Sequence, residues 1–280
     1  MAALRGMLQQ IAMVFAAAYG VVVLLVWLTQ DRLVYFPHIG GISTATPAQV
    51  KLPFENVRIA TADGETLAAW WVPAAPLRGV ILLLHGNAGS IADRIDYLPP
   101  FNAMGHAVLL VDYRGYGAST GKPSEAGTYA DAQAAWHWLT VQRGFKPADI
   151  VLVGESLGGA VAAELAARVQ PQALVLISVF TSATELGSEI YPWLPVRLIS
   201  RYRYDTLGHV RKFSGPVLVA HSRDDEIVPF AHGERLYAAA TGAKTLLEMR
   251  GGHNDGFLFS RPEWTVKVEA FLARSGSAIR

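Results

Sequence analysis

The first thirty residues contain a long apolar segment. From Ile11 to Leu28 every residue is apolar or small. As an α-helix this segment would extend ~27 Å, close to the ~30 Å hydrocarbon core of a bilayer. Trp27 lies near one end, where an interfacial aromatic residue is expected. The pattern predicts an N-terminal transmembrane anchor over residues 1–32.

A cleaved signal peptide and a buried core helix are the alternatives for this segment. A signal peptide usually has a shorter apolar region, and the cleavage-like run Ala16–Ala18 lies inside the apolar segment. Length therefore favours a retained single span. Arg5 flanks one end and Asp31 and Arg32 flank the other, so charge sets the orientation only weakly, toward an extracytoplasmic position for the rest of the chain.

The pattern changes twice after the anchor. A connector rich in Gly, Pro, Ser and Thr covers residues 33–53, and an alternating stretch around Asp63-Gly64 then predicts an antiparallel hairpin. From Val80 onward, short runs that are apolar throughout alternate with helix-length segments. This alternation predicts an α/β domain over residues 54–280, with a mostly parallel central sheet flanked by helices. The apolar runs cover residues 80–84, 107–111, 150–153, 173–177, 216–220 and 245–249.

One interval is too long for an ordinary crossover. About 38 residues separate the strand ending near Ile177 from the one starting at Pro216. We expect this interval to form a small cap insertion over about 180–213.

Composition narrows the functional classes. The 280 residues are 51% hydrophobic and 17% charged, which argues against disorder. A net charge of +1 without a long basic run gives no indication of a nucleic-acid partner. Cysteine is absent, which excludes disulfides, zinc–thiolate sites and a cysteine nucleophile. Nothing in the sequence bears on the oligomeric state.

The strongest chemical motif is Gly154-Glu155-Ser156-Leu157-Gly158. It lies between a strand-like run and a helix-like run. A tight strand-to-helix turn needs neighbours with almost no side chain, and it lifts the serine hydroxyl out at the carboxyl edge of the sheet. The pattern predicts that Ser156 is a nucleophile, with the positive end of the following helix beside it.

A serine nucleophile needs a base, and in this kind of fold the base follows the serine and the acid in the chain. His253 lies in a glycine-rich loop just after the last strand, so we expect it to be the base. Among the other histidines, His221 ends a strand, His232 lies in a helix-like stretch where a surface position is expected, and His209 lies in the expected cap.

The orienting acid should follow a strand between Ser156 and His253. Asp224 and Asp225 both do so, and spacing alone does not separate them. A solvated turn carboxylate or a helix N-cap is the structural alternative for either. Weaker candidates are Asp205 and Asp255.

The loop after the run at 80–84 reads HGNAGS. Its small residues would let backbone amides approach a reacting carbonyl. We expect the amides of Asn87 and Leu157 to form an oxyanion hole, and each such donor typically contributes ~2.7–4 kcal/mol to transition-state stabilisation. His85 precedes the serine, so we expect it to organise the loop. An ordinary Gly-rich turn is the alternative.

These motifs together resemble the α/β-hydrolase fold. Within it, the chain is similar to membrane-anchored serine hydrolases related to the ABHD-type acyl hydrolases and protein depalmitoylases. The resemblance extends in order from Leu33 to Asp255. The matching stretches include LVYFP (33–37), HGNAGS (85–90), DYRGYGAS (112–119), GESLGGAVA (154–162), YPWLPV (191–196), HSRDDEIVP (221–229) and GGHND (251–255).

The resemblance implies roles that spacing leaves open. The family's acid is the aspartate four places after the histidine of an H-G-x-x-D-x-x-V-P stretch, which corresponds to Asp225 here. Ser222 stands where glycine is usual. The resemblance also implies that Asp112 and Arg114 shape the loop beside the site and that the substrate is an ester.

The sequence therefore predicts a serine ester hydrolase that uses Ser156, His253 and Asp225 and needs no metal or organic cofactor. Its substrate would be a small-molecule or lipid acyl ester, or an acyl-protein thioester. Tyr191, Trp193 and Leu194 would line an apolar wall for the acyl chain, or would only pack the cap. The alternatives are an amidase or peptidase with the same residues, and a non-catalytic binding protein on the same scaffold.

Overall fold

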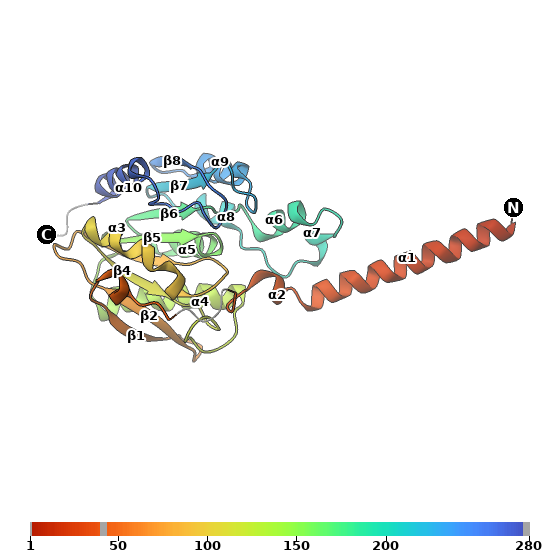
Figure 1. The fold of residues 1–280 in the computed structure, drawn as a ribbon, viewed down its shortest axis with the longest axis horizontal. Coiled ribbons are helices and arrows are strands. Elements are labelled where there is room, and N and C mark those ends of the chain that lie inside the picture. The colour runs from red at the N-terminus through yellow and green to blue at the C-terminus, as the bar shows by residue number, and fades with distance from the viewer. Residues whose placement is uncertain (1, 40–43, 277–280) are drawn as a thin grey trace.

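The structure is a computed structural model that describes residues 2–39 and 44–276. A single helix, α1 (Ala2–Leu28), projects as an arm from an α/β body (Figure 1). The segment Leu4–Leu28 of this helix is long and apolar enough to cross a membrane, and none of its most apolar stretch is buried. Such a helix is either an anchor or a signal sequence.

The body is built on one eight-stranded sheet, in the order β1-β2-β4-β3-β5-β6-β7-β8. The pairs β1–β2 and β2–β4 are antiparallel, and all remaining pairs are parallel. This architecture confirms the predicted hairpin and the predicted mostly parallel sheet. The strands are β1 (Glu55–Ala60), β2 (Thr66–Val72), β3 (Gly79–Leu84), β4 (His106–Val111), β5 (Ile150–Glu155), β6 (Ala173–Ile177), β7 (Val217–Ser222) and β8 (Lys244–Met249).

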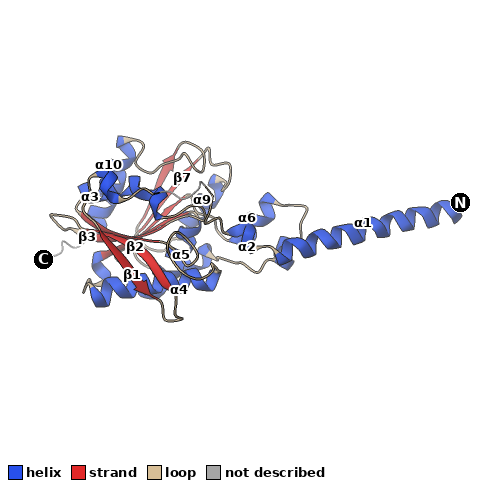
Figure 2. Cartoon of the chain, turned by 60° about the horizontal axis from the view of Figure 1, so that its bottom comes forward, coloured by secondary structure: helices blue, strands red, loops and turns tan. Residues whose placement is uncertain are grey.

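Helices cover both faces of the sheet (Figure 2). The described helices of the body are α2 (Asp31–Val34), α3 (Leu98–Ala103), α4 (Glu125–His137), α5 (Leu157–Val169), α6 (Ala183–Ile190), α7 (Val196–Ile199), α8 (Thr206–Val210), α9 (Phe230–Ala239) and α10 (Pro262–Ser275). Shorter turns of 3₁₀ helix cover Pro47–Val50, Ile91–Tyr97 and Pro147–Asp149, and a π-helical turn covers Trp138–Gln142.

Buried strands explain the continuous apolar runs. Alternate residues of β3 enter two separate hydrophobic clusters. Val80 and Leu82 pack with α4, α5 and α9, whereas Ile81 and Leu83 pack with α3 and α10. Because both faces of the strand are covered, every position must be apolar, and the period-two pattern of a half-exposed strand is absent.

The interval between β6 and β7 contains α6, α7 and α8. We call residues 180–213 the cap segment. It lies beside the base of the arm, at the end of the body from which α1 projects (Figure 1).

The turn from β5 to α5 leaves no room for side chains at two glycines. A Cβ added at Gly158 would lie 2.1 Å from the carbonyl oxygen of Leu84 and 2.4 Å from that of His85. A Cβ at Gly154 would lie 2.4 Å from the carbonyl oxygen of Gly158. The strand, the helix and the loop after β3 therefore meet backbone to backbone.

We predict that Gly158→Ala lowers the free energy of unfolding by about 1–3 kcal/mol, because overpacking of this size forces backbone shifts. Thermal unfolding of the full chain in detergent measures the effect. Gly187→Ala in α6 is the control, because its new methyl would meet only a side-chain methyl of Val196 at 3.2 Å. Equal melting temperatures for the two variants would contradict the prediction.

Candidate active site

Ser156 occupies the turn between β5 and α5 in a strained conformation. Its backbone has φ 49° and ψ −116°, a region that non-glycine residues rarely adopt. Its amide donates to the carbonyl of Ile177 at 2.9 Å, which ties the turn to β6. Ser156 directly precedes α5, so its hydroxyl lies at the positive end of that helix.

His253 lies beside Ser156 at the carboxyl edge of the sheet. It comes from the loop after β8, and its Nε2 is 3.2 Å from the Ser156 Oγ. Its backbone amide donates to Glu226 Oε2 at 3.0 Å, which fixes the loop against the end of β7. The histidine nitrogen therefore lies within hydrogen-bond reach of the serine proton.

Asp225 contacts the other side of the same imidazole. His253 Nδ1 is 2.8 Å from Asp225 Oδ2 and 3.0 Å from Oδ1. Burial acts to raise the pKa of this carboxyl, but hydrogen bonds from His253 and from the amides of Val228 and Ile227 outweigh it and hold the pKa below its usual range. Asp225 therefore stays ionised at neutral pH, and its carboxylate favours the imidazole tautomer whose proton is on Nδ1.

The other acidic candidates lie elsewhere. Asp224 is exposed and pairs with Arg250 at 3.0 Å. Asp205 caps α8, where it accepts from the amide of Gly208 at 3.0 Å. Asp255 is exposed in the loop that carries His253.

Three of the other histidines, His221, His85 and His232, have structural partners. His221 is buried, donates from Nε2 to the carbonyl of Val228 at 2.8 Å, and has its pKa lowered by burial. His85 Nδ1 lies 2.7 Å from the carbonyl of Gly86. The surface position expected for His232 is wrong, because the face of α9 that carries it packs against the cap segment. Its ring lies 2.8 Å from Thr181 Oγ1 and 3.1 Å from Glu189 Oε2.

The loop that carries Asn87 is held by the chain that follows the arm. The amide of Phe36 donates to the Asn87 carbonyl at 2.9 Å, and the Asn87 side chain donates to the Val34 carbonyl at 3.0 Å. The Tyr116 hydroxyl also donates to the Asn87 carbonyl, at 2.9 Å. Within residues 2–39 and 44–276, the backbone amides of Asn87 and Leu157 donate to no protein acceptor.

The neighbouring loop residues also have the supporting positions that the resemblance implies. Asp112 accepts from the amide of Ile91 at 2.9 Å. Arg114 bonds Asp131 at 2.9 Å and Asp63 at 2.7 Å. Neither side chain is bonded to Ser156 or His253.

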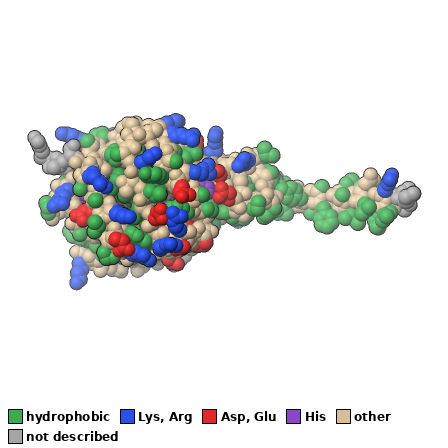
Figure 3. Space-filling view, turned by 90° about the horizontal axis from the view of Figure 1, so that it is seen from above, with side chains coloured by type: hydrophobic (Ala, Val, Ile, Leu, Met, Phe, Trp, Pro, Cys, Tyr) green, Lys and Arg blue, Asp and Glu red, His purple; other side chains and the backbone are tan. Residues whose placement is uncertain are grey.

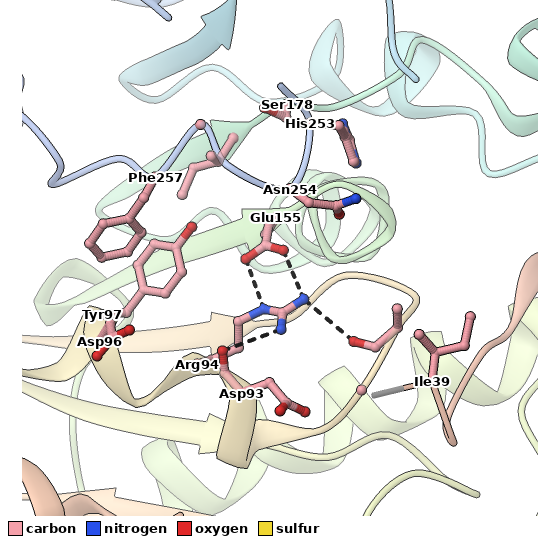
Figure 4. Close-up of a pocket in the computed structure, with 14 residues that line it drawn as sticks. Ile39, Asp93, Arg94, Asp96, Tyr97, Glu155, Ser178, His253, Asn254 and Phe257 are labelled. Carbon is pink, nitrogen blue, oxygen red and sulfur yellow. Dashed lines mark hydrogen bonds and ion pairs between the residues drawn. The ribbon is translucent and has the colours of Figure 1, made fainter. Parts of the chain in front are cut away.

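A polar pocket of about 390 Å³ adjoins His253. Arg94 and Glu155 form a double ion pair on its wall, at 3.0 and 2.9 Å, and Asp93, Asp96 and Asn254 are also among its lining residues (Figure 4). Burial raises the pKa of the adjacent Tyr97 phenol, and the Glu155 carboxylate raises it further. The pocket therefore suits a polar group better than a hydrocarbon chain.

The sequence did not identify Arg94 or Glu155 as site residues. Glu155 lies inside the Ser156 motif, and this position was the only feature of the sequence that pointed to it as a site residue. Arg94 is 61 positions away in the chain and has no local pattern that marks it.

The three residues expected to bind an acyl chain lie apart from this pocket. Tyr191 and Trp193 are exposed and pack edge to face, with ring centroids 6.4 Å apart, and Leu194 is buried. None of the three is among the residues that line the pocket beside His253. In the described part of the chain, no group of three or more His, Asp or Glu side chains is arranged to hold a metal ion.

Comparisons with known proteins support the family and the fold. Residues 79–205 match a family model described as the alpha/beta hydrolase fold. The uncharacterized protein Rv2307c of Mycobacterium tuberculosis is 41% identical over 269 residues, which cover 95% of this chain and 94% of that protein. The alpha/beta hydrolase domain-containing protein WAV2 of Arabidopsis thaliana is 34% identical over 254 residues, 82% of each chain.

A solved structure supports the same fold. The esterase Pf2001 of Pyrococcus furiosus superposes with a TM-score of 0.70 at 22% identity, and covers 86% of this chain and 97% of its own. At this identity the likeness concerns the fold.

We predict that Arg94→Met lowers the free energy of unfolding by about 1–3 kcal/mol, because it leaves the Glu155 carboxylate partly buried without its partner. Urea denaturation measures the loss. The control is the double variant Arg94→Met/Glu155→Gln, which should lose less than the sum of the single variants because the two side chains interact directly. Additive losses would contradict a direct coupling.

Proposed function

The chain belongs to the ABHD-type α/β-hydrolases, and from this premise we propose that it is a serine ester hydrolase. The observation that carries the proposal is the continuous contact from Ser156 Oγ through the His253 imidazole to the Asp225 carboxylate. A serine hydroxyl is a poor nucleophile at neutral pH, and this arrangement supplies the base and the orienting charge that it needs.

In the first half of the reaction, Ser156 Oγ attacks the acyl carbonyl while His253 Nε2 takes the hydroxyl proton. Asp225 keeps the other imidazole proton on Nδ1 and stabilises the imidazolium that forms. The carbonyl oxygen becomes negative and accepts hydrogen bonds from the amides of Asn87 and Leu157.

In the second half, His253 gives its proton to the leaving alcohol, which departs and leaves an acyl group on Ser156. Water then attacks the acyl-enzyme, with His253 again as base, and Ser156 is regenerated with release of the acid. Each step needs only a proton carried by His253, so none of them calls for a metal or an organic cofactor.

Helix α1 serves as a membrane anchor in this proposal. Its apolar segment of 25 residues exceeds the roughly 20 that a span requires. An enzyme tethered in this way meets lipid esters and acylated membrane proteins at high local concentration, so we infer that its substrate is an acyl ester or acyl thioester at the membrane.

We predict that Ser156→Ala abolishes hydrolysis of p-nitrophenyl esters, because the hydroxyl that forms the acyl-enzyme is gone. The full chain in detergent micelles is assayed with acyl chains from two to sixteen carbons. A fluorophosphonate probe should label the wild type and not Ser156→Ala. Wild-type turnover equal to that of Ser156→Ala at every length, together with no labelling, would instead support a binding protein on this scaffold.

The two neighbouring aspartates provide a matched pair of variants. Asp225→Asn should lower kcat by roughly 10⁴-fold, because the amide favours the wrong imidazole tautomer. Asp224→Asn should leave kcat near the wild-type value, because it removes only an exposed ion pair with Arg250. Steady-state kinetics with the preferred ester measures both, and a larger loss for Asp224→Asn would reverse the assignment.

A further inference from the structure

We propose that the tip of the cap segment inserts into the lipid leaflet that the body-proximal half of α1 crosses. We define the cap tip as Ile190, Tyr191, Trp193 and Leu198, all of which are exposed. The inference rests on the membrane anchor proposed above and is independent of the hydrolytic chemistry.

The cap segment is bonded to α1 at both ends of a shared contact. The Tyr19 hydroxyl donates to the Trp193 carbonyl at 2.8 Å. Eleven residues further along, in the turn that follows α1, the Gln30 side chain donates to the Ile199 carbonyl at 2.8 Å and accepts from the Arg201 amide at 2.9 Å. The cap segment therefore lies along the body-proximal part of α1, from Tyr19 to the end of the helix.

One face of α1 makes this contact. Tyr19, Val23 and Val26 are spaced by four and three residues, so they lie on the same side of the helix, and Gln30 follows in the turn after α1. Val23 and Val26 are half-buried and Gln30 is buried, whereas most of the other side chains from Val21 to Leu28 are exposed. The remaining faces of the arm are apolar and uncovered, and Figure 3 shows few charged side chains along it.

The Tyr19–Trp193 bond sets the depth of the cap tip. Trp27 lies under the Arg201 guanidinium, 5.4 Å from its ring centroid, as an aromatic residue at the membrane interface would. Tyr19 precedes Trp27 by eight residues, which is roughly 12 Å along a helix axis, or ~11 Å with an average tilt of about 20°. Half of the hydrocarbon core measures about 15 Å, so with Trp27 at the interface Trp193 lies below the headgroups, within the leaflet.

The chemistry of the cap segment suits that position. Leu198 is 86% exposed and Trp193 is 57% exposed, which is unfavourable in water and favourable in lipid. The two carboxylates of α6 face the body, where Glu185 pairs with Arg235 and Glu189 with His232.

Arginines dominate the exposed charge beside the cap tip. Arg197 and Arg203 are exposed, and Arg201 is exposed and pairs with Asp31 at 3.2 Å, while the exposed Glu189 pairs with His232. Their long side chains can reach back to the phosphates of anionic headgroups while the neighbouring apolar residues remain in the leaflet. A soluble protein partner would not reach Trp193 beside a helix that is already surrounded by lipid.

Site-directed spin labelling tests the inference directly. The chain has no cysteine, so each single substitution gives one labelled site. Leu198→Cys reports on the cap tip, Val14→Cys on the middle of α1, and Val266→Cys on an exposed position of α10 at the opposite end of the body. The labelled full chains are reconstituted in vesicles of phosphatidylcholine with a minority of phosphatidylglycerol. Relaxation by oxygen, which partitions into lipid, is compared with relaxation by a water-soluble nickel chelate.

We expect the oxygen-to-nickel accessibility ratio at Leu198 to shift well above that at Val266 and toward that at Val14. A ratio at Leu198 equal to that at Val266, with Val14 in lipid, would overturn the inference and leave the anchor intact. A low ratio at Val14 would overturn both. Spin–spin broadening at Leu198 that disappears on dilution with unlabelled protein would show that a second copy covers the cap tip, which also overturns the inference. The ester assay of Ser156→Ala reports separately on the proposed chemistry.

Discussion

The backbone of Ser156 is the constraint on which the site depends. A residue with φ 49° at the end of β5 can persist only because the surroundings over-determine it. The contact of Gly158 with the Leu84 and His85 carbonyls brings α5, β5 and the loop after β3 together at backbone distance. The same turn that holds Ser156 therefore fixes the amide of Leu157 and the loop that carries Asn87, so the proposed nucleophile and the proposed amide donors are positioned by one packing arrangement.

The chain between the arm and the sheet adds a second constraint. Val34 and Phe36 bond the Asn87 loop, while Gln30 bonds the cap segment a few residues earlier. The segment that leaves α1 is therefore shared between the loop beside Ser156 and the cap. A membrane anchor joined in this way differs from one on a loose linker, because it orients the site relative to the bilayer as well as holding it nearby.

The sequence predicted the features that local patterns encode. Strands buried on both faces must be apolar throughout, and the Ser156 turn needs its glycines, so the sheet and the position of the Ser156 turn follow from the sequence. Features that depend on contacts between distant segments could not be predicted from the sequence. Asp224 and Asp225 differ in which side chain turns inward after β7. Spacing in the sequence did not separate them, and only the family resemblance favoured Asp225. The pairing of Arg94 with Glu155, the burial of His232 and the contact of the cap segment with α1 each join elements with no common local signal.

The proposed mechanism and the polarity of the site together constrain how a substrate lies. His253 must protonate the leaving group, so that group lies within reach of the imidazole, and the imidazole lines the pocket that contains Arg94 and Glu155. A hydrocarbon chain there would gain little of the ~0.8 kcal/mol per CH₂ that apolar burial provides, and it would desolvate an ion pair. The leaving alcohol is therefore the polar part of the substrate. In this mechanism the acyl chain extends away from the pocket that contains Arg94 and Glu155.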